Sequence, residues 1–116
     1  MSWLRHSTSA VFCLGVFLAI PALADDVNLK EDARELGITV GQNYACTPDD
    51  NRAMARAESE SIYDVILFGI DHEHAYIYAV AVGYGAAMKK DDIDCENLDA
   101  RLAVVRSRMQ LEGAER

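Results

Sequence analysis

The segment from Ala75 to Met88 constrains the fold most, because it runs for fourteen residues without a charge in a chain that is 26% charged. Its tyrosine, isoleucine and valine residues would also suit a strand. A strand of this length would be unusual, and helical patterns lie on both sides of the segment, so we predict a helix. With 100° between successive residues, its apolar side chains point in every direction. Such a helix has to be covered on all sides.

This middle helix presents three faces on a helical wheel. The first face is bulky, the second is a ladder of small residues repeated every four positions, and the third combines Tyr78 with Val82. The bulky face consists of Ile77, Tyr84 and Met88, and the ladder of Ala75, Ala79, Gly83 and Ala87. Because small side chains reduce the distance between helix axes, the ladder predicts a closely packed neighbouring helix.

Amphipathic helices are predicted before and after the middle helix. The earlier one begins with Thr47 as N-cap and Pro48 in the first position, and it ends at Gly69. Its apolar positions are Met54, Ala57, Ile62, Val65 and Phe68. The last helix carries an apolar stripe at steps of four, three and four residues: Leu98, Leu102, Val105 and Met109. A short N-terminal helix should run from Asn28 to Gly37, with 38–45 irregular.

The first 24 residues have the layout of a secretory signal peptide. Arg5 and His6 precede an apolar run over 10–20, Pro21 breaks that run, and cleavage is expected after Ala24. The run has about half of the roughly 20 apolar residues that a membrane anchor needs, so an uncleaved tether is the less favoured alternative. We therefore predict export to the periplasm; the exterior is the other destination that the sequence leaves open.

Two cysteines remain in the predicted single domain, 25–116, because Cys13 lies in the signal peptide. An even number in an exported chain favours a disulfide between Cys46 and Cys95 over a redox pair, which would favour a C-x-x-C spacing. Closing this loop, 95 − 46 = 49 residues, should stabilise the fold by about 4 kcal/mol. The bridge fits an all-α, up-down-up three-helix bundle with a short N-terminal helix, because the first and third helices then start at the same end.

Charge and motifs argue against several function classes. Without Arg5 the domain has 10 Lys plus Arg against 19 Asp plus Glu, a net charge of −9, which disfavours nucleic acid. His72 and His74 point about 200° apart on a helix and lack further ligands, so no metal is expected. Instead, Asp71 is expected to cap the middle helix, with both histidines in its solvated first turn. No serine lies in a glycine-flanked nucleophile turn. We predict a protein that is not an enzyme, needs no cofactor, and has no membrane contact once the signal peptide is removed.

The main indication of function is that two neighbouring helices cannot bury every apolar face of the middle helix, so something else has to cover the remaining face. The N-terminal segment around Ile38, Val40 and Tyr44 is one candidate cover, and a second subunit or a partner protein is the other. Tyrosine is favoured at interfaces. The predicted partner or homodimer interface consists of Tyr76, Ile77, Tyr78, Tyr84 and Met88.

In architecture alone, a small acidic exported helical protein with one disulfide resembles two groups, the immunity proteins that neutralise toxins and the acid-stress chaperones of the bacterial periplasm. The first resemblance implies an inhibitor-like protein that presents an apolar surface, ringed by acid, to a basic partner. The second implies a dimer that dissociates and exposes an apolar helix when carboxylates are protonated. A structural subunit of an envelope assembly is a third possibility. Partner binding ranks first, because the chain has the hydrophobicity of a packed domain.

Overall fold

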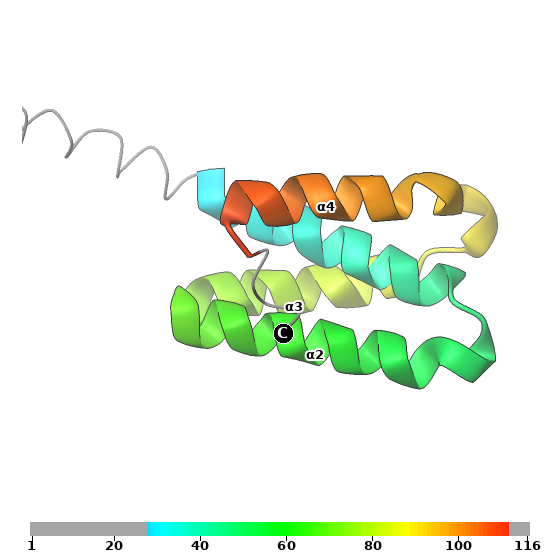
Figure 1. Cartoon of the computed structure of the whole chain (residues 1–116), viewed down its shortest axis with the longest axis horizontal. Helices are drawn as coiled ribbons and strands as arrows, with labels where there is room; N and C mark the ends of the chain where they lie inside the picture. Colours follow the sequence, from blue (N-terminus) through cyan, green and yellow to red (C-terminus); the bar gives the residue numbers. More distant parts are fainter. Residues whose placement is uncertain (1–27, 112–116) are drawn as a thin grey trace, which may run out of the picture.

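The computed structural model describes residues 28–111, and its regular elements are all helical (Figure 1). An N-terminal helix over 28–46 is followed by η1 (Asp49–Asn51), α2 (Arg52–Gly69), α3 (His72–Ala86), η2 (Lys90–Asp92), η3 (Cys95–Asn97) and α4 (Leu98–Met109). The all-α prediction is confirmed for this part of the chain. The predicted signal peptide, 1–24, lies outside the described residues and stays a prediction.

The expected short N-terminal helix with an irregular continuation is wrong. One helix continues through Gly37 and Gly41 and ends only at residue 46. Both glycines are buried against α3, so packing holds them in a helix that their intrinsic preferences would weaken. The described chain therefore has four α-helices instead of three long ones and a short one.

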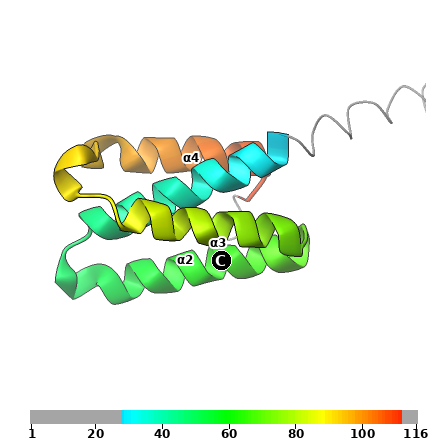
Figure 2. The ribbon, with the colours of Figure 1, turned by 180° about the vertical axis from the view of Figure 1, so that it is seen from behind.

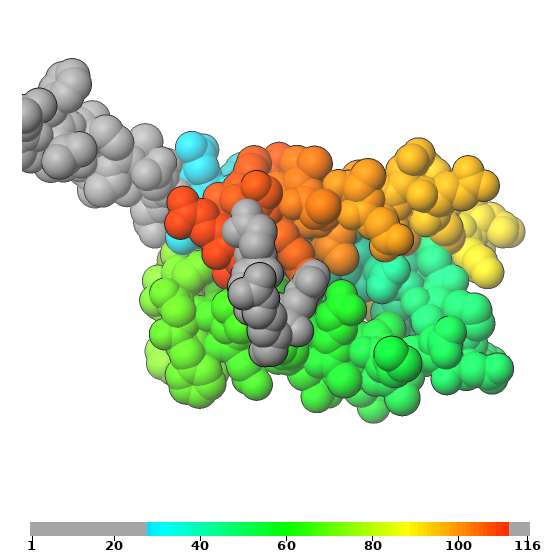
Figure 3. Space-filling model, in the orientation of Figure 1, coloured from blue at the N-terminus to red at the C-terminus, as the bar shows by residue number. Residues whose placement is uncertain are grey.

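The four helices pack around a shared apolar core. Figures 1 and 2 show the N-terminal helix beside α4, with α2 and α3 side by side beneath them. In the space-filling view, α4 and α2 fill most of the face toward the viewer (Figure 3). All four helices contribute to the core cluster, which consists of Ala33, Leu36, Val40, Ile62, Ile66, Ala75, Tyr78, Val105 and Met109, together with Leu111.

A disulfide joins the N-terminal helix to η3 at one end of the molecule. Cys46 is the last residue of the N-terminal helix, Cys95 opens η3, and their Cα atoms lie 5.9 Å apart. The predicted pairing is confirmed. It ties the end of the N-terminal helix to the start of the segment that leads into α4.

The helix ends agree with the sequence in part. Asp71 caps α3 as expected, and α2 ends at Gly69. Thr47 does not cap α2, because its hydroxyl donates to the carbonyl of Asn43 at 2.6 Å instead. α4 ends before Gly113, with Gln110 in the left-handed conformation at φ 60°.

α2 and α4 differ in how well the apolar positions predicted from the sequence match the residues that are buried. In α4 the expected stripe faces inward: Leu98, Val105 and Met109 are buried and Leu102 is half-buried. In α2 the buried residues are Ile62 and Ile66, whereas the expected core positions Met54 and Phe68 are exposed. The contribution of α2 to the core is therefore narrower than its apolar residues suggest.

Candidate interaction surface

The inner face of α3 (His74, Tyr78, Ala81 and Gly85) is buried and packs against the N-terminal helix at backbone distance. A Cβ atom added at Gly85 would collide with the carbonyl oxygen of Ile38 and lie 2.9 Å from the amide nitrogen of Gln42. From the other side, a Cβ at Gly41 would collide with the carbonyl oxygen of Val82. Only glycine fits at these two positions, because the opposing atoms belong to the backbone.

The small-residue ladder expected to receive a neighbouring helix does so only at its first residue, Ala75, which is buried in the core. Its other members, Ala79, Gly83 and Ala87, are exposed, and nothing lies within 4 Å of a Cβ added at Gly83. The signal that sequence reasoning missed is in the N-terminal helix, where small residues recur every four positions: Ala33, Gly37, Gly41 and Ala45. This repeat marks the surface that α3 contacts.

Tyr78 belongs to the core and not to the predicted interface. It is 1% exposed, and its hydroxyl donates to the main-chain carbonyl of Ser59 at 3.0 Å. Burial raises the pKa of Tyr78 to about 12, because the charged phenolate would lose its hydration. The face that the sequence assigned to Tyr78 and Val82 is thus directed into the bundle.

His74 is also buried, contrary to the expectation that both histidines lie in a solvated first turn. Its Nδ1 atom lies 2.6 Å from the Oδ1 atom of Asp71, and its backbone N–H donates to the same carboxylate at 2.8 Å. The backbone hydrogen bond, followed by the side-chain one, lowers the pKa of Asp71 below its ordinary value. The pair therefore fixes the start of α3, while His72 is exposed.

The outer face of α3 is exposed and carries no charge after its first turn, where the exposed Glu73 lies three residues before Tyr76. Past that turn it consists of Tyr76, Ala79, Val80, Gly83 and Tyr84, with Ala87 directly after the helix. Its three large side chains follow one another at four-residue steps and are 70%, 57% and 66% exposed. A surface helix normally directs charged residues to water. An uncharged outer face of this length makes α3 the strongest candidate for an interaction surface.

A groove beside the outer face extends the apolar surface toward the N-terminal helix. It has a volume of about 530 Å³ and is lined by Arg34, Ile38, Tyr76, Ile77, Val80, Ala81 and Tyr84. Three of the predicted interface residues, Tyr76, Ile77 and Tyr84, thus lie together. Met88 does not join them in this groove, because it is half-buried and its sulfur accepts from Nε2 of Gln42 at 3.2 Å.

Charges of both signs surround the outer face, in place of the expected acidic ring. Asp71 and Glu73 lie at the start of α3, where Glu73 pairs with Lys30 at 2.8 Å. The exposed Lys89 and Lys90 follow its other end, and the exposed Asp91 and Asp92 come directly after them. The charges nearest to the helix are therefore acidic at its start and basic after its end, although the four charges of 89–92 cancel.

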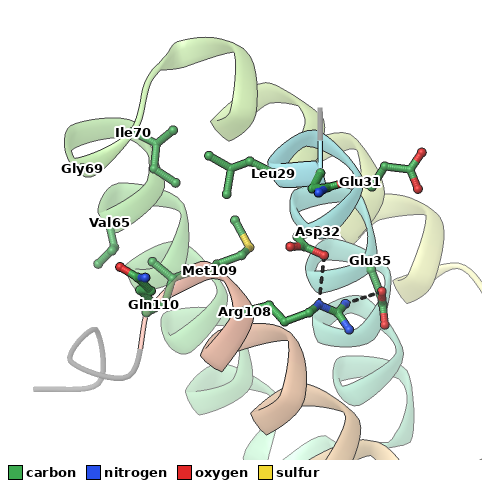
Figure 4. A pocket seen from close by; sticks show the side chains of 12 residues that line it. Leu29, Glu31, Asp32, Glu35, Val65, Gly69, Ile70, Arg108, Met109 and Gln110 are labelled. Carbon is green, nitrogen blue, oxygen red and sulfur yellow. Dashed lines mark hydrogen bonds and ion pairs between the residues drawn. The ribbon is translucent and has the colours of Figure 1, made fainter. Parts of the chain in front are cut away.

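A second hollow, of about 1060 Å³, lies where the N-terminal helix, the end of α2 and the end of α4 meet (Figure 4). Arg108 crosses it to Asp32 at 3.1 Å and to Glu35 at 2.6 Å. Desolvation opposes the charge of Arg108, but the two carboxylates outweigh it and raise the pKa above its ordinary value. Because Arg108 belongs to α4 and both carboxylates belong to the N-terminal helix, these ion pairs hold the two helices together (Figure 4).

Within residues 28–111, no group of three or more His, Cys, Asp and Glu side chains is placed to hold a metal ion. In the same range, no helix has the length and apolar character needed to cross a membrane. Comparison of the chain with protein-family models, curated protein sequences and solved structures finds no match.

Proposed function

We propose that the protein acts by binding another protein through the outer face of α3, without catalysing a reaction. The observation that carries this proposal is the exposure of Tyr76, Val80 and Tyr84 on a face without charge. Monomeric proteins rarely leave contiguous apolar patches in water, and exposed tyrosines are favoured contact residues. Tyrosine also contributes a large contact area at a low cost in side-chain entropy.

The scaffold supports a pre-organised binding surface. α3 is held on one side by backbone-distance contacts with the N-terminal helix, and that helix is fastened by the Cys46–Cys95 disulfide. A rigid surface loses little entropy on binding. We accordingly place the protein among exported, periplasmic binding proteins of the inhibitor-like or immunity-like kind, built as a bundle whose helices alternate in direction.

An acid-activated chaperone is less well supported by the same surface. Such a protein needs carboxylates whose protonation uncovers the apolar helix. The outer face contains no carboxylate beyond the first turn of α3, and Asp71 and Glu73 lie only at its start.

Photo-crosslinking in the producing cells tests the proposed function. A photoreactive residue at position 80 or 84 should give a defined crosslinked product with a different protein, because these positions lie in the outer face. The same residue at position 107, which is exposed on α4, is the matched control and should give none. Equal products at 80, 84 and 107, or no product at 80 and 84, would overturn the proposal.

A further inference from the structure

We infer that a second copy of this chain covers the outer face of α3 when no other protein is bound, in a two-fold dimer with the two α3 helices antiparallel. This inference rests on the proposed function, because it assigns an occupant to the same face. It makes the dimer the resting form and the monomer the form that a different partner binds.

The order of residues on the outer face is self-complementary. Tyr76 and Tyr84 lie four residues before and four residues after Val80. If a two-fold axis passes near Val80, the antiparallel copy places its Tyr84 opposite Tyr76 and its Val80 opposite Val80. A two-fold interface requires this property, since one surface has to match itself after rotation. Heterologous partners place no such demand on the sequence.

The small residues of the outer face provide room for the second helix. Ala79, Gly83 and Ala87 alternate with the larger side chains, and a Cβ at Gly83 would have open space around it. On the inner face, Gly85 of the same helix already lets the N-terminal helix approach to backbone distance. The small residues beside the facing tyrosines therefore leave room for the second helix to approach.

The charges at the ends of α3 favour the antiparallel orientation. The start of the helix is acidic, with Asp71 and Glu73, and Lys89 and Lys90 follow its other end, before the exposed Asp91 and Asp92. Antiparallel helices bring Asp71 and Glu73 of one copy toward Lys89 and Lys90 of the other, whereas parallel helices bring like charges together. Glu73 already pairs with Lys30 of its own chain, so the attraction between the helix ends of the two copies selects the orientation more than it adds affinity.

The size of the face predicts a weak, displaceable dimer. At 150–250 Å² for each aromatic side chain, of which 70% and 66% is exposed at Tyr76 and Tyr84, the four tyrosines of a dimer would bury roughly 400–700 Å², against about 1,200 Å² for a stable specific interface. The side chains around them, including Ile38 and Val80, add further apolar area. We expect a Kd of about 10 μM, weak enough for a tighter-binding protein to displace the copy.

Sedimentation equilibrium tests the inference directly. The protein, expressed from the full chain and purified oxidised, is measured from about 1 to about 200 μM in about 0.15 M salt, where long-range repulsion between acidic copies is screened. The unchanged protein should convert from monomer to dimer across this range. Val80→Lys should raise the Kd about 100-fold or more, because two ammonium groups would meet at the axis. Val104→Lys, at an exposed valine of α4, is the matched control and should leave the Kd unchanged.

The orientation is tested by charge reversal. Glu73→Lys alone, and Lys89→Glu with Lys90→Glu, should each weaken the dimer severalfold. Combining all three changes in one chain should restore it, because opposite charges then meet again across an antiparallel interface. Failure of the combined variant to recover would contradict the antiparallel arrangement.

Each outcome bears on the dimer separately from the proposed function. A monomer at every concentration, or an equal loss in Val80→Lys and Val104→Lys, would overturn the dimer. A defined crosslink at position 80 to a different protein would still support the proposed function in that case. Circular dichroism of each variant shows that a lost dimer does not reflect a lost fold.

Discussion

The inner and outer faces of α3 are made of similar residues and have opposite surroundings. Each combines a tyrosine with small side chains: Tyr78, Ala81 and Gly85 on the inner face, and Tyr76, Ala79 and Gly83 on the outer face. The inner face is buried against the N-terminal helix, whereas the outer face is exposed. Apolar composition therefore does not decide which side of this helix faces the core.

The difference lies in what the neighbouring helix offers. The N-terminal helix has its own small residues, Gly37 and Gly41, opposite Tyr78, Ala81 and Val82. Two glycine-bearing surfaces can approach until backbone meets backbone, which excludes water and gains many van der Waals contacts. The outer face has no such partner among the described residues. A repeat of small residues on one helix therefore predicts a close contact only when another helix carries small residues at the matching positions.

The largest effect should come from releasing the N-terminal helix from the disulfide. Replacing Cys46 and Cys95 by serine should lower the free energy of unfolding by about 4 kcal/mol, because the unfolded chain regains the entropy of an open 49-residue loop. Urea unfolding measures this change, and amide hydrogen exchange should rise in the N-terminal helix more than in α2. Reduced wild-type protein is the control and should match the double variant. A loss spread evenly over all helices would show that the inner contact does not depend on this end.

Replacing Gly83 or Gly85 of α3 by alanine should change the free energy of unfolding in opposite directions. Gly85→Ala should destabilise the protein by about 3 kcal/mol, because the new methyl group meets the Ile38 carbonyl and the backbone has to move. Gly83→Ala should stabilise the monomer by up to about 1 kcal/mol, because alanine is the better helix former and has open space. Urea unfolding at low protein concentration compares them. Similar values for the two variants would remove the distinction between the faces.

The sequence predicted the elements better than their contacts. The uncharged run over 75–88, the cap at Asp71 and the stripe of α4 were sufficient to predict helices. Cysteine parity was sufficient to predict the disulfide. The N-terminal helix was predicted too short because Gly37 resembles a helix end, and only the contact with α3 explains why Gly37 and Gly41 lie inside a helix.

The residues predicted to form one interface are separated in the structure for a related reason. Ile77, Tyr76 and Tyr84 line one groove, whereas Tyr78 is buried in the core. Helical periodicity separates these residues into faces correctly. It does not indicate which face is covered when all of them are apolar. That choice depends on long-range packing between the N-terminal helix and α3.

The tyrosines of the two faces should differ in their contribution to stability. Tyr78→Phe should cost about 1 kcal/mol at neutral pH, because the Ser59 carbonyl loses a buried hydrogen-bond donor. The exposed Tyr76→Phe is the control and should be close to neutral. Urea unfolding of the two variants at the same protein concentration measures the difference.

The same pair gives a pH test with a defined sign. The phenol of Tyr78 titrates at about 12 in the folded protein and near 10.0 when unperturbed, so the unfolded state loses its proton first as the pH rises. Stability should therefore fall between pH 10 and about 12 in the wild type and in Tyr76→Phe. This part of the fall should be absent in Tyr78→Phe. An identical alkaline profile in all three proteins would contradict the burial of this phenol.

The smallest effect on folding should come from Val80, the centre of the outer face. Val80→Gln should change the free energy of unfolding of the dilute monomer by no more than about 0.5 kcal/mol, because the side chain is already 57% exposed. At high protein concentration a second copy stabilises the folded state by mass action, so the wild-type urea midpoint should rise with concentration. The midpoint of Val80→Gln should rise less. A large loss of stability in dilute solution would mean that this face is part of the core, and the contrast between the two faces of α3 would be lost.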